Sequence, residues 1–235
     1  MQLSYLEFGE KGKTIVFLHG WQQDKKSLSS LAPYLYQEYR LFFLDLPGFG
    51  QSDRPKDNFT SFDYADAVKS WINQKKLKNI NLAGHSFGGK IAAIISAQNP
   101  KLVSKLILMA CSGVVSPPKQ PPLRKFIPKP LVKLGRPLYI KLFASRDYKQ
   151  AANLLPIFKS VVKEDLTEIF RQINIPTLIL WGKEDEELPF SNGQKINNLI
   201  KGSFFSLVSG SHFFFQQQPQ ETASLISKFI EDGKI

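Results

Sequence analysis

Short apolar runs alternate with longer amphipathic stretches along most of the 235 residues. The runs are rich in Val, Ile, Leu and Phe, which is typical of strands buried on both faces of a sheet. The stretches between them have the length and the apolar spacing of helices. Strands separated by helices predict an α/β fold, with a mostly parallel sheet and helices on both faces. The expected strands are 14–18, 41–44, 80–83, 103–109, 177–181 and 204–208, and the expected helices are 61–74, 87–98, 194–200 and 221–230.

The helix expected at 61–74 is the clearest amphipathic segment. It opens with a Ser-Phe-Asp sequence that resembles a helix cap. Its apolar residues Phe62, Ala65, Val68 and Ile72 are spaced to form one stripe. We therefore expect these four side chains to be buried.

The alternation is interrupted from residue 112 to about residue 163. No strand pattern occurs there, and prolines cluster in its first half, at Pro117, Pro118, Pro121, Pro122, Pro128, Pro130 and Pro137. Short apolar helical pieces follow, around 138–143 and 150–162. We expect a core domain made of residues 1–111 and 164–235, with residues 112–163 inserted as a lid of small helices.

A glycine-rich turn joins the strand at 80–83 to the helix at 87–98. It has the sequence Gly84-His85-Ser86-Phe87-Gly88-Gly89. Glycines two residues either side of the serine allow a sharp turn without Cβ clashes. The turn would hold Ser86 in a strained conformation at its tip, with the N-terminus of a helix behind it. This strand–turn–helix context indicates a nucleophilic serine.

A serine hydroxyl needs a general base, and the chain has three histidines. His85 adjoins Ser86, so in a tight turn its side chain should point elsewhere. For His19, which ends an early strand, we favour a structural role in its loop over proton transfer. His212 follows the last expected strand, so elimination and position both select it as the base.

The base in turn needs a carboxylate to orient it. The loop after the strand at 177–181 contains four carboxylates, and spacing alone does not separate them. They are Glu184, Asp185, Glu186 and Glu187.

Backbone amides supply the last expected feature, an oxyanion site. A tetrahedral intermediate needs donors aimed at its negative oxygen. The sequence His19-Gly20-Trp21 follows the strand at 14–18, and Phe87 follows the serine. The N–H groups of Trp21 and Phe87 are the candidates.

Taken together, these motifs resemble those of the α/β-hydrolase superfamily, in the branch of lidded serine esterases, C–C bond hydrolases and cofactor-free haloperoxidases. The resemblance covers both ends and the middle of the chain and leaves out the lid. It implies the chain order serine, acid, histidine, and it selects Asp185 as the acid, three residues after Gly182. It also implies that the loop 45–52 lies near the pocket, where we favour turn stabilisation over catalysis for Asp45. The matching segments are 19–21, 45–52, 84–89, 181–185 and 209–212.

The expected function is hydrolysis of carboxylic esters of small or medium acyl substrates through an acyl-enzyme on Ser86. No metal or organic cofactor is required, so none is expected. Two alternatives remain open on the same residues: C–C bond hydrolysis with the same triad, and a ligand-binding protein that retains the hydrolase fold.

The net charge of +11 is concentrated in the expected lid. Residues 112–163 contain eleven basic side chains and one acidic side chain, Asp147. One hypothesis is that the lid contacts an anionic surface, such as a lipid headgroup layer; the alternative, which we favour, is a solvated outer face. Nucleic acid is not expected as a partner, because no aromatic–basic platform accompanies the charge.

Cellular context is only weakly constrained. The single cysteine, Cys111, excludes an intramolecular disulfide. The N-terminus lacks the pattern of a signal peptide, and no run of about 18 apolar residues predicts a membrane span. A cytoplasmic location is the expectation.

Overall fold

A computed structural model of the chain describes residues 1–114 and 146–234, and of residues 146–153 it describes the backbone only. Seven strands form one sheet in the order β1-β3-β2-β4-β5-β6-β7, and all neighbours are parallel except β1 and β3. The strands are β1 (Tyr5–Phe8), β2 (Lys13–Leu18), β3 (Tyr39–Leu44), β4 (Ile80–His85), β5 (Val103–Met109), β6 (Thr177–Gly182) and β7 (Phe204–Val208).

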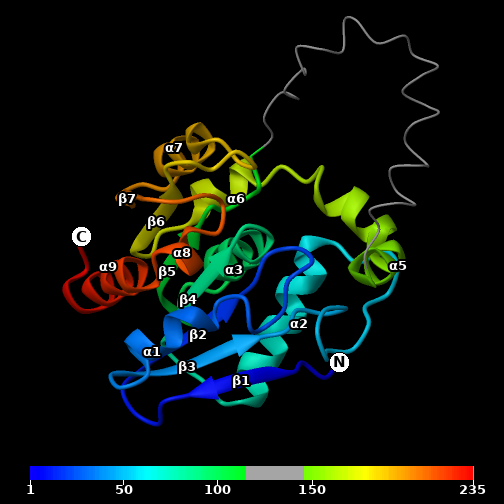
Figure 1. Ribbon diagram of the computed structural model, residues 1–235, viewed down its shortest axis with the longest axis horizontal. Helices are drawn as coiled ribbons and strands as arrows, with labels where there is room; N and C mark the ends of the chain where they lie inside the picture. Colours follow the sequence, from blue (N-terminus) through cyan, green and yellow to red (C-terminus); the bar gives the residue numbers. More distant parts are fainter. Residues whose placement is uncertain (115–145, 235) are drawn as a thin grey trace, which may run out of the picture.

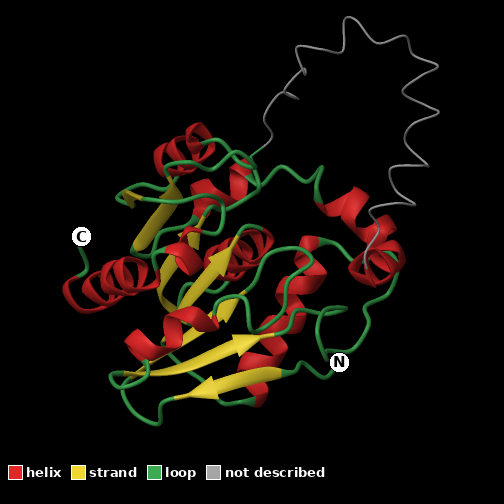
Figure 2. Ribbon diagram, viewed as in Figure 1, coloured by secondary structure: helices red, strands yellow, loops and turns green. Residues whose placement is uncertain are grey.

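Two groups of helices flank the sheet, as Figures 1 and 2 show. In one group α2 packs on α3, α3 on α6 and α6 on α7; in the other α9 packs on α1 and α8. This arrangement confirms the α/β fold class predicted from the alternating pattern. The helices are η1 (Ser29–Leu31), α1 (Ala32–Leu35), α2 (Ser61–Gln74), α3 (Phe87–Gln98), α5 (Arg146–Val161), α6 (Thr167–Gln172), α7 (Phe190–Leu199), α8 (Phe214–Gln217) and α9 (Pro219–Asp232).

The central strands explain why the sequence shows apolar runs there. Every residue of β4 and of β6 is buried, because helices cover both faces of the sheet at these positions. β1 is different: it lies at the edge, pairs antiparallel with β3 and is only partly buried. All of the expected strands occur, with ends that differ by no more than two residues.

The buried face of α2 shares Ala65, Val68 and Ile72 with the expected stripe but not Phe62. The helix buries Tyr64, Ala65, Val68, Trp71 and Ile72 along with Ser61, whereas Phe62 is 39% exposed. The expectation that Phe62 is buried was therefore wrong, because it lies one position outside the i, i+3, i+4, i+7 row.

The start of α2 is also set differently from the expected Ser-Phe-Asp cap. The residue at the N-cap is Thr60, whose hydroxyl accepts a hydrogen bond from the Asp63 amide, while the Asp63 carboxylate accepts one from the Thr60 amide. This reciprocal pair is a capping box.

The expected lid falls largely outside the described residues. The helical piece at 138–143 and most of the basic side chains belong to the range 115–145. The described part of the insertion includes residues 112–114 and 146–163. Its helix α5 overlaps the piece expected at 150–162 and lies between β5 and β6 in the chain. The boundary of the lid stays a prediction, and the contact with an anionic surface stays a hypothesis beside the favoured solvated face.

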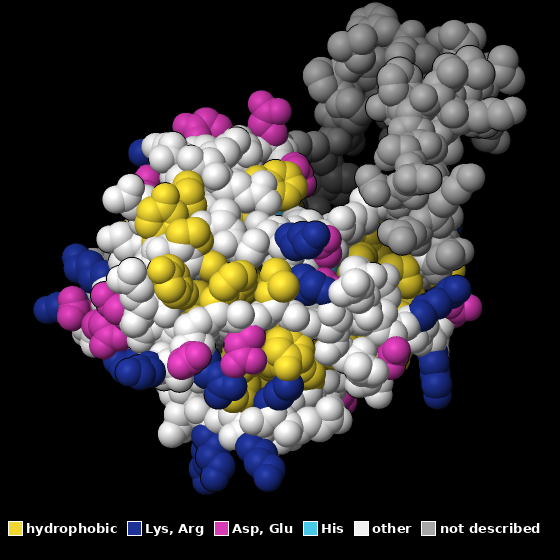
Figure 3. Space-filling model, turned by 60° about the horizontal axis from the view of Figure 1, so that its bottom comes forward, with side chains coloured by type: hydrophobic (Ala, Val, Ile, Leu, Met, Phe, Trp, Pro, Cys, Tyr) yellow, Lys and Arg dark blue, Asp and Glu magenta, His cyan; other side chains and the backbone are white. Residues whose placement is uncertain are grey.

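The remaining surface carries charges of both signs. On the face shown in Figure 3, basic and acidic side chains lie among small apolar patches. None of the helices in residues 1–114 and 146–234 is both long and apolar enough to cross a membrane.

The corrected face of α2 can be tested by a pair of substitutions. Ile72→Ala should lower the free energy of unfolding by about 2–5 kcal/mol, because Ile72 is fully buried. Phe62→Ala should lower it by about 1 kcal/mol, because the ring is 39% exposed and only partly packed. Urea unfolding of both variants measures the difference, and equal losses would contradict the assignment.

Candidate active site

The turn that carries Ser86 has the expected strained geometry. Ser86 has φ = 49° and ψ = −109°, between the end of β4 and the first residue of α3. A Cβ on Gly88 would overlap the carbonyl oxygen of Leu18, and one on Gly84 would overlap that of Gly88. The two glycines therefore let β2, β4 and α3 approach closely enough to hold this bend.

The acidic loop after β6 brings one of its four carboxylates to His212. Asp185 Oδ2 lies 2.8 Å from His212 Nδ1, and both side chains are buried. Asp185 Oδ1 accepts hydrogen bonds from the amides of Glu187 at 2.9 Å and Leu188 at 2.8 Å. The carboxylate is thus held from both oxygens, and Nδ1 of His212 donates to it.

The other three carboxylates have different positions. Glu184 accepts a hydrogen bond from the Gly210 amide, and Glu186 is exposed. Glu187 Oε2 lies 3.8 Å from His212 Nε2, and its side chain is 61% exposed. The structure thus separates the residues that sequence spacing left equivalent, with Asp185 the one that pairs with Nδ1 of His212.

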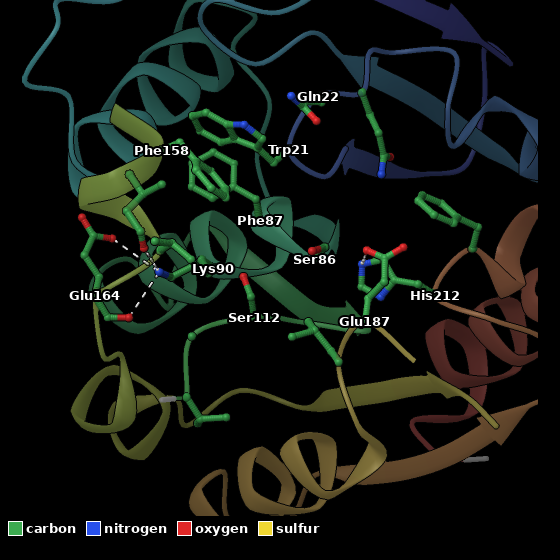
Figure 4. A pocket seen from close by; sticks show the side chains of 17 residues that line it. Trp21, Gln22, Ser86, Phe87, Lys90, Ser112, Phe158, Glu164, Glu187 and His212 are labelled. Carbon is green, nitrogen blue, oxygen red and sulfur yellow. Dashed lines mark hydrogen bonds and ion pairs between the residues drawn. The ribbon is translucent and has the colours of Figure 1, made fainter. Parts of the chain in front are cut away.

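Ser86 and His212 line one cavity of about 390 Å³ (Figure 4). Their loops lie close together: the ring centroid of His85, the residue before Ser86, is 4.6 Å from that of His212. Apolar and aromatic side chains make up much of the remaining lining. The lining residues are Trp21, Gln22, Gln23, Ser86, Phe87, Lys90, Ser112, Gly113, Val114, Phe158, Val161, Val162, Glu164, Glu187, Leu188, His212 and Phe213.

Trp21 and Phe87, whose amides were the candidates for the oxyanion site, both border this cavity. The Phe87 amide is the first of α3, so it has no acceptor within the helix. Trp21 follows β2 and is succeeded by Gln22, which has φ = 60°. The Trp21 ring packs on Phe87 at 5.1 Å and on Phe49 at 5.0 Å between centroids, which fixes this segment.

His85 points away from the serine, as expected, and joins three loops. Because a carbonyl only accepts, His85 Nε2 carries a proton and donates to the His212 carbonyl oxygen at 3.0 Å. Nδ1 then accepts a hydrogen bond from the side-chain nitrogen Nε2 of Gln23 at 3.4 Å, and Oε1 of Gln23 accepts one from the backbone amide of Gly20. Burial holds the pKa of His85 well below its ordinary value of 6.5, so the ring stays neutral.

His19 has the structural role that its position suggested. Its Nε2 accepts a hydrogen bond from the Leu46 amide at 3.0 Å, and its Nδ1 donates to the Gly20 carbonyl oxygen at 2.7 Å. Burial lowers the pKa of His19 from 6.5 to about 4. His19 therefore links the Trp21 segment to the loop after β3 rather than moving protons.

The loop 45–52 supports the cavity from behind. Asp45 accepts hydrogen bonds from the Lys25 amide, the Lys25 ammonium and the Gln51 amide, all within 3.0 Å. This agrees with turn stabilisation. The loop supplies no lining residue, but its Phe49 ring contacts Trp21, so the implied proximity to the pocket is one layer removed.

Several lining residues were not identified from the sequence. Lys90 and Glu164 form an ion pair at 3.6 Å, and Gln23, Ser112 and Phe158 also border the cavity. One signal was available for Lys90, since it is the only charged residue in the apolar helix 87–98. No group of three or more side chains suited to a metal ion occurs within residues 1–114 and 146–234.

Comparison with known proteins identifies the class to which this fold and site belong. A family model described as the alpha/beta hydrolase fold matches residues 13–129. The AB hydrolase superfamily protein YisY of Bacillus subtilis is 31% identical, over 93% of this chain and 91% of its own length. The chain therefore belongs to the α/β-hydrolase superfamily.

Two further proteins resemble the chain over nearly all of its length. The uncharacterized hydrolase YugF of Bacillus subtilis is 26% identical over 93% of this chain and 90% of its own. The crystal structure of a membrane phospholipase A is 28% identical and covers 98% of this chain and 82% of its own, with a TM-score of 0.82. The fold and the similarity to these relatives together identify the chain as a hydrolase.

The neutral His19 makes stability depend on pH. The unfolded chain binds a proton at His19 near pH 6.5, but the folded chain binds it only near pH 4. The free energy of unfolding should therefore fall by about 3 kcal/mol from this residue as the pH is lowered from 7 to 4, and His85 adds to the fall.

Urea unfolding at pH 7, 5.5 and 4 measures this dependence. His19→Gln, which retains a donor and an acceptor, should show a shallower fall than the unsubstituted protein. The same pH dependence in both proteins would contradict the assignment.

Proposed function

We propose that this protein hydrolyses carboxylic esters of small or medium acyl chains, with Ser86, His212 and Asp185 as its catalytic triad. The proposal rests chiefly on one observation: a strained serine and a buried Asp–His pair line the same cavity. Kinship with a membrane phospholipase A, an ester hydrolase by name, supports ester bonds as the target.

The mechanism follows from the hydrogen-bonding roles of the site. Ser86 Oγ attacks the acyl carbonyl carbon while His212 Nε2 takes the hydroxyl proton, and Asp185 stabilises the imidazolium that forms. The amides of Trp21 and Phe87 bind the oxyanion. The C–O bond to the alcohol then breaks, and His212 protonates the leaving oxygen.

Water completes the cycle. His212 removes a proton from a water molecule, whose oxygen attacks the acyl-enzyme carbonyl. The bond to Ser86 breaks, the acid leaves, and the proton returns to the serine. No group other than water and the ester is consumed.

The first test combines active-site labelling with turnover. A fluorophosphonate probe should label the protein and fail to label Ser86→Ala, and p-nitrophenyl acetate and butyrate should be hydrolysed. Asp185→Asn should lower kcat about ten-thousandfold, because the amide can hold His212 in the wrong tautomer and no longer stabilises the imidazolium. Asp66→Asn, on the exposed side of α2, serves as the matched control and should leave kcat unchanged.

The outcomes separate the alternative functions. Labelling without turnover of any p-nitrophenyl ester favours C–C bond hydrolysis on the same triad. Absence of labelling favours a ligand-binding protein that retains the fold.

A second prediction concerns Glu187, the carboxylate near His212 Nε2. A negative charge about 4 Å from the imidazolium contributes about 1 kcal/mol in an aqueous environment. Glu187→Gln should therefore lower kcat/KM for a neutral ester about fivefold at low salt, and less at high salt. Glu186→Gln, in the same loop but outside the cavity lining, is the control, and equal effects of the two variants would contradict a specific role.

A further inference from the structure

A buried lysine lies one helical turn after the proposed nucleophile. Lys90, on α3, is only 3% exposed, and burial lowers the pKa of its ammonium group. A lysine is rarely buried unless its charge is paired and its donors are used. The proposed mechanism uses neither the charge nor the donors of Lys90.

The partners of Lys90 all belong to the segment where the insertion returns to the core. Its Nζ donates to the carbonyl oxygens of Val161 at 2.5 Å and Glu164 at 3.3 Å, and Glu164 Oε2 lies 3.6 Å away (Figure 4). Val161 is the last residue of α5, and the last carbonyls of a helix lack donors within the helix. The ammonium group therefore caps α5 and compensates its dipole.

The second carboxylate oxygen of Glu164 extends this junction to another helix. Oε1 accepts a hydrogen bond from the Ser61 amide, at the start of α2, at 3.1 Å. Lys90 and Glu164 together thus join α2, α3 and the end of α5. Val161, whose carbonyl is held here, and the adjacent Val162 form a wall of the cavity.

The geometry of the proposed reaction indicates which part of the substrate lies beside Val161 and Val162. The leaving oxygen must point toward His212, because His212 protonates it. The acyl chain then extends from the carbonyl carbon away from His212. In Figure 4, Lys90, Glu164 and Phe158 lie on the side of the cavity away from His212.

We propose that Lys90 is a specificity-determining positioning residue, which sets the depth of the acyl side by fixing the end of α5 against α3. This inference rests on the proposed function, since it assumes that an acyl chain occupies the cavity. Lys90 acts through α5 rather than on the substrate: Nζ donates hydrogen bonds to the carbonyl oxygens of Val161 and Glu164 and pairs with the Glu164 carboxylate at 3.6 Å. Its side chain borders the cavity but is only 3% exposed.

The test compares acyl-chain profiles of four proteins. These are the unsubstituted protein, Lys90→Met, Lys90→Arg and the control Lys101→Met, whose lysine is exposed in the turn after α3. kcat and KM are measured for p-nitrophenyl esters from acetate to dodecanoate. A thermal melt of each protein checks that it is folded.

Lys90→Met should free the end of α5 from α3 and move the optimum of kcat/KM to longer acyl chains. The ratio of kcat/KM for decanoate to that for acetate should rise about tenfold, which corresponds to about 1.4 kcal/mol of additional binding free energy for the longer chain. The change should lie mainly in KM and be smallest for acetate, which is too short to reach the wall. Lys90→Arg should restore most of the original profile, and Lys101→Met should not alter it.

Two results would overturn the inference: an unchanged profile in Lys90→Met, or a fall in kcat/KM by the same factor at every chain length. If Lys90→Met does not fold, Glu164→Gln takes its place, because it keeps the lysine but weakens the ion pair. A smaller shift in the same direction is then expected, and no shift overturns the inference.

Failure of the proposed function would be recognised separately. If the unsubstituted protein hydrolyses none of the esters, thermal stabilisation by the acids from acetate to dodecanoate replaces turnover as the readout. A preference for longer acids in Lys90→Met than in the unsubstituted protein supports the role of Lys90, and identical preferences overturn it.

Discussion

The bend at Ser86 is the constraint on which the rest of the site depends. A non-glycine residue at φ = 49° and ψ = −109° is unfavourable by itself and persists only where its surroundings determine it. Here the surroundings are the close approach of β2, β4 and α3, which the absence of side chains at Gly84 and Gly88 permits. The same approach puts the Phe87 amide and the Trp21 segment on one cavity.

A buried chain of hydrogen bonds holds the three loops of the site in register. It runs from the His212 carbonyl through the His85 ring and the Gln23 side chain to the Gly20 amide. Each member has a donor or acceptor for its partner, so a neutral His85 is consistent with its complete burial. The imidazole of His212 is thereby positioned from its backbone as well as from Asp185.

The sequence was sufficient for the strands and for the order of the site motifs, because both depend on local pattern. Buried parallel strands read as apolar runs, and their carboxyl ends lie at one edge of the sheet, where Leu18, His85, Gly182 and Val208 end β2, β4, β6 and β7. The acid was not separable by spacing, since its selection depends on burial and on amides donated within its own loop. Phe62 was wrongly expected to be buried for a similar reason. It is apolar and lies next to the buried face of α2, so the sequence pattern does not distinguish it from a residue on that face.

Lys90 marks the limit of sequence reasoning most clearly. A single lysine in an otherwise apolar helix is unexpected, because the apolar residues predict that the helix is buried and a buried charge is unfavourable. Such inconsistencies tend to mark functional positions. Its partners lie more than 70 residues away and are mainly backbone carbonyls, which every residue type supplies. No pattern of side chains could have indicated them.

The junction also makes the end of the insertion part of the core, since α3 carries both the bend at Ser86 and the ammonium group that caps α5. Substrate preference and nucleophile position therefore depend on the same helix. A change at Lys90, its fourth residue, can alter the preference without moving Ser86.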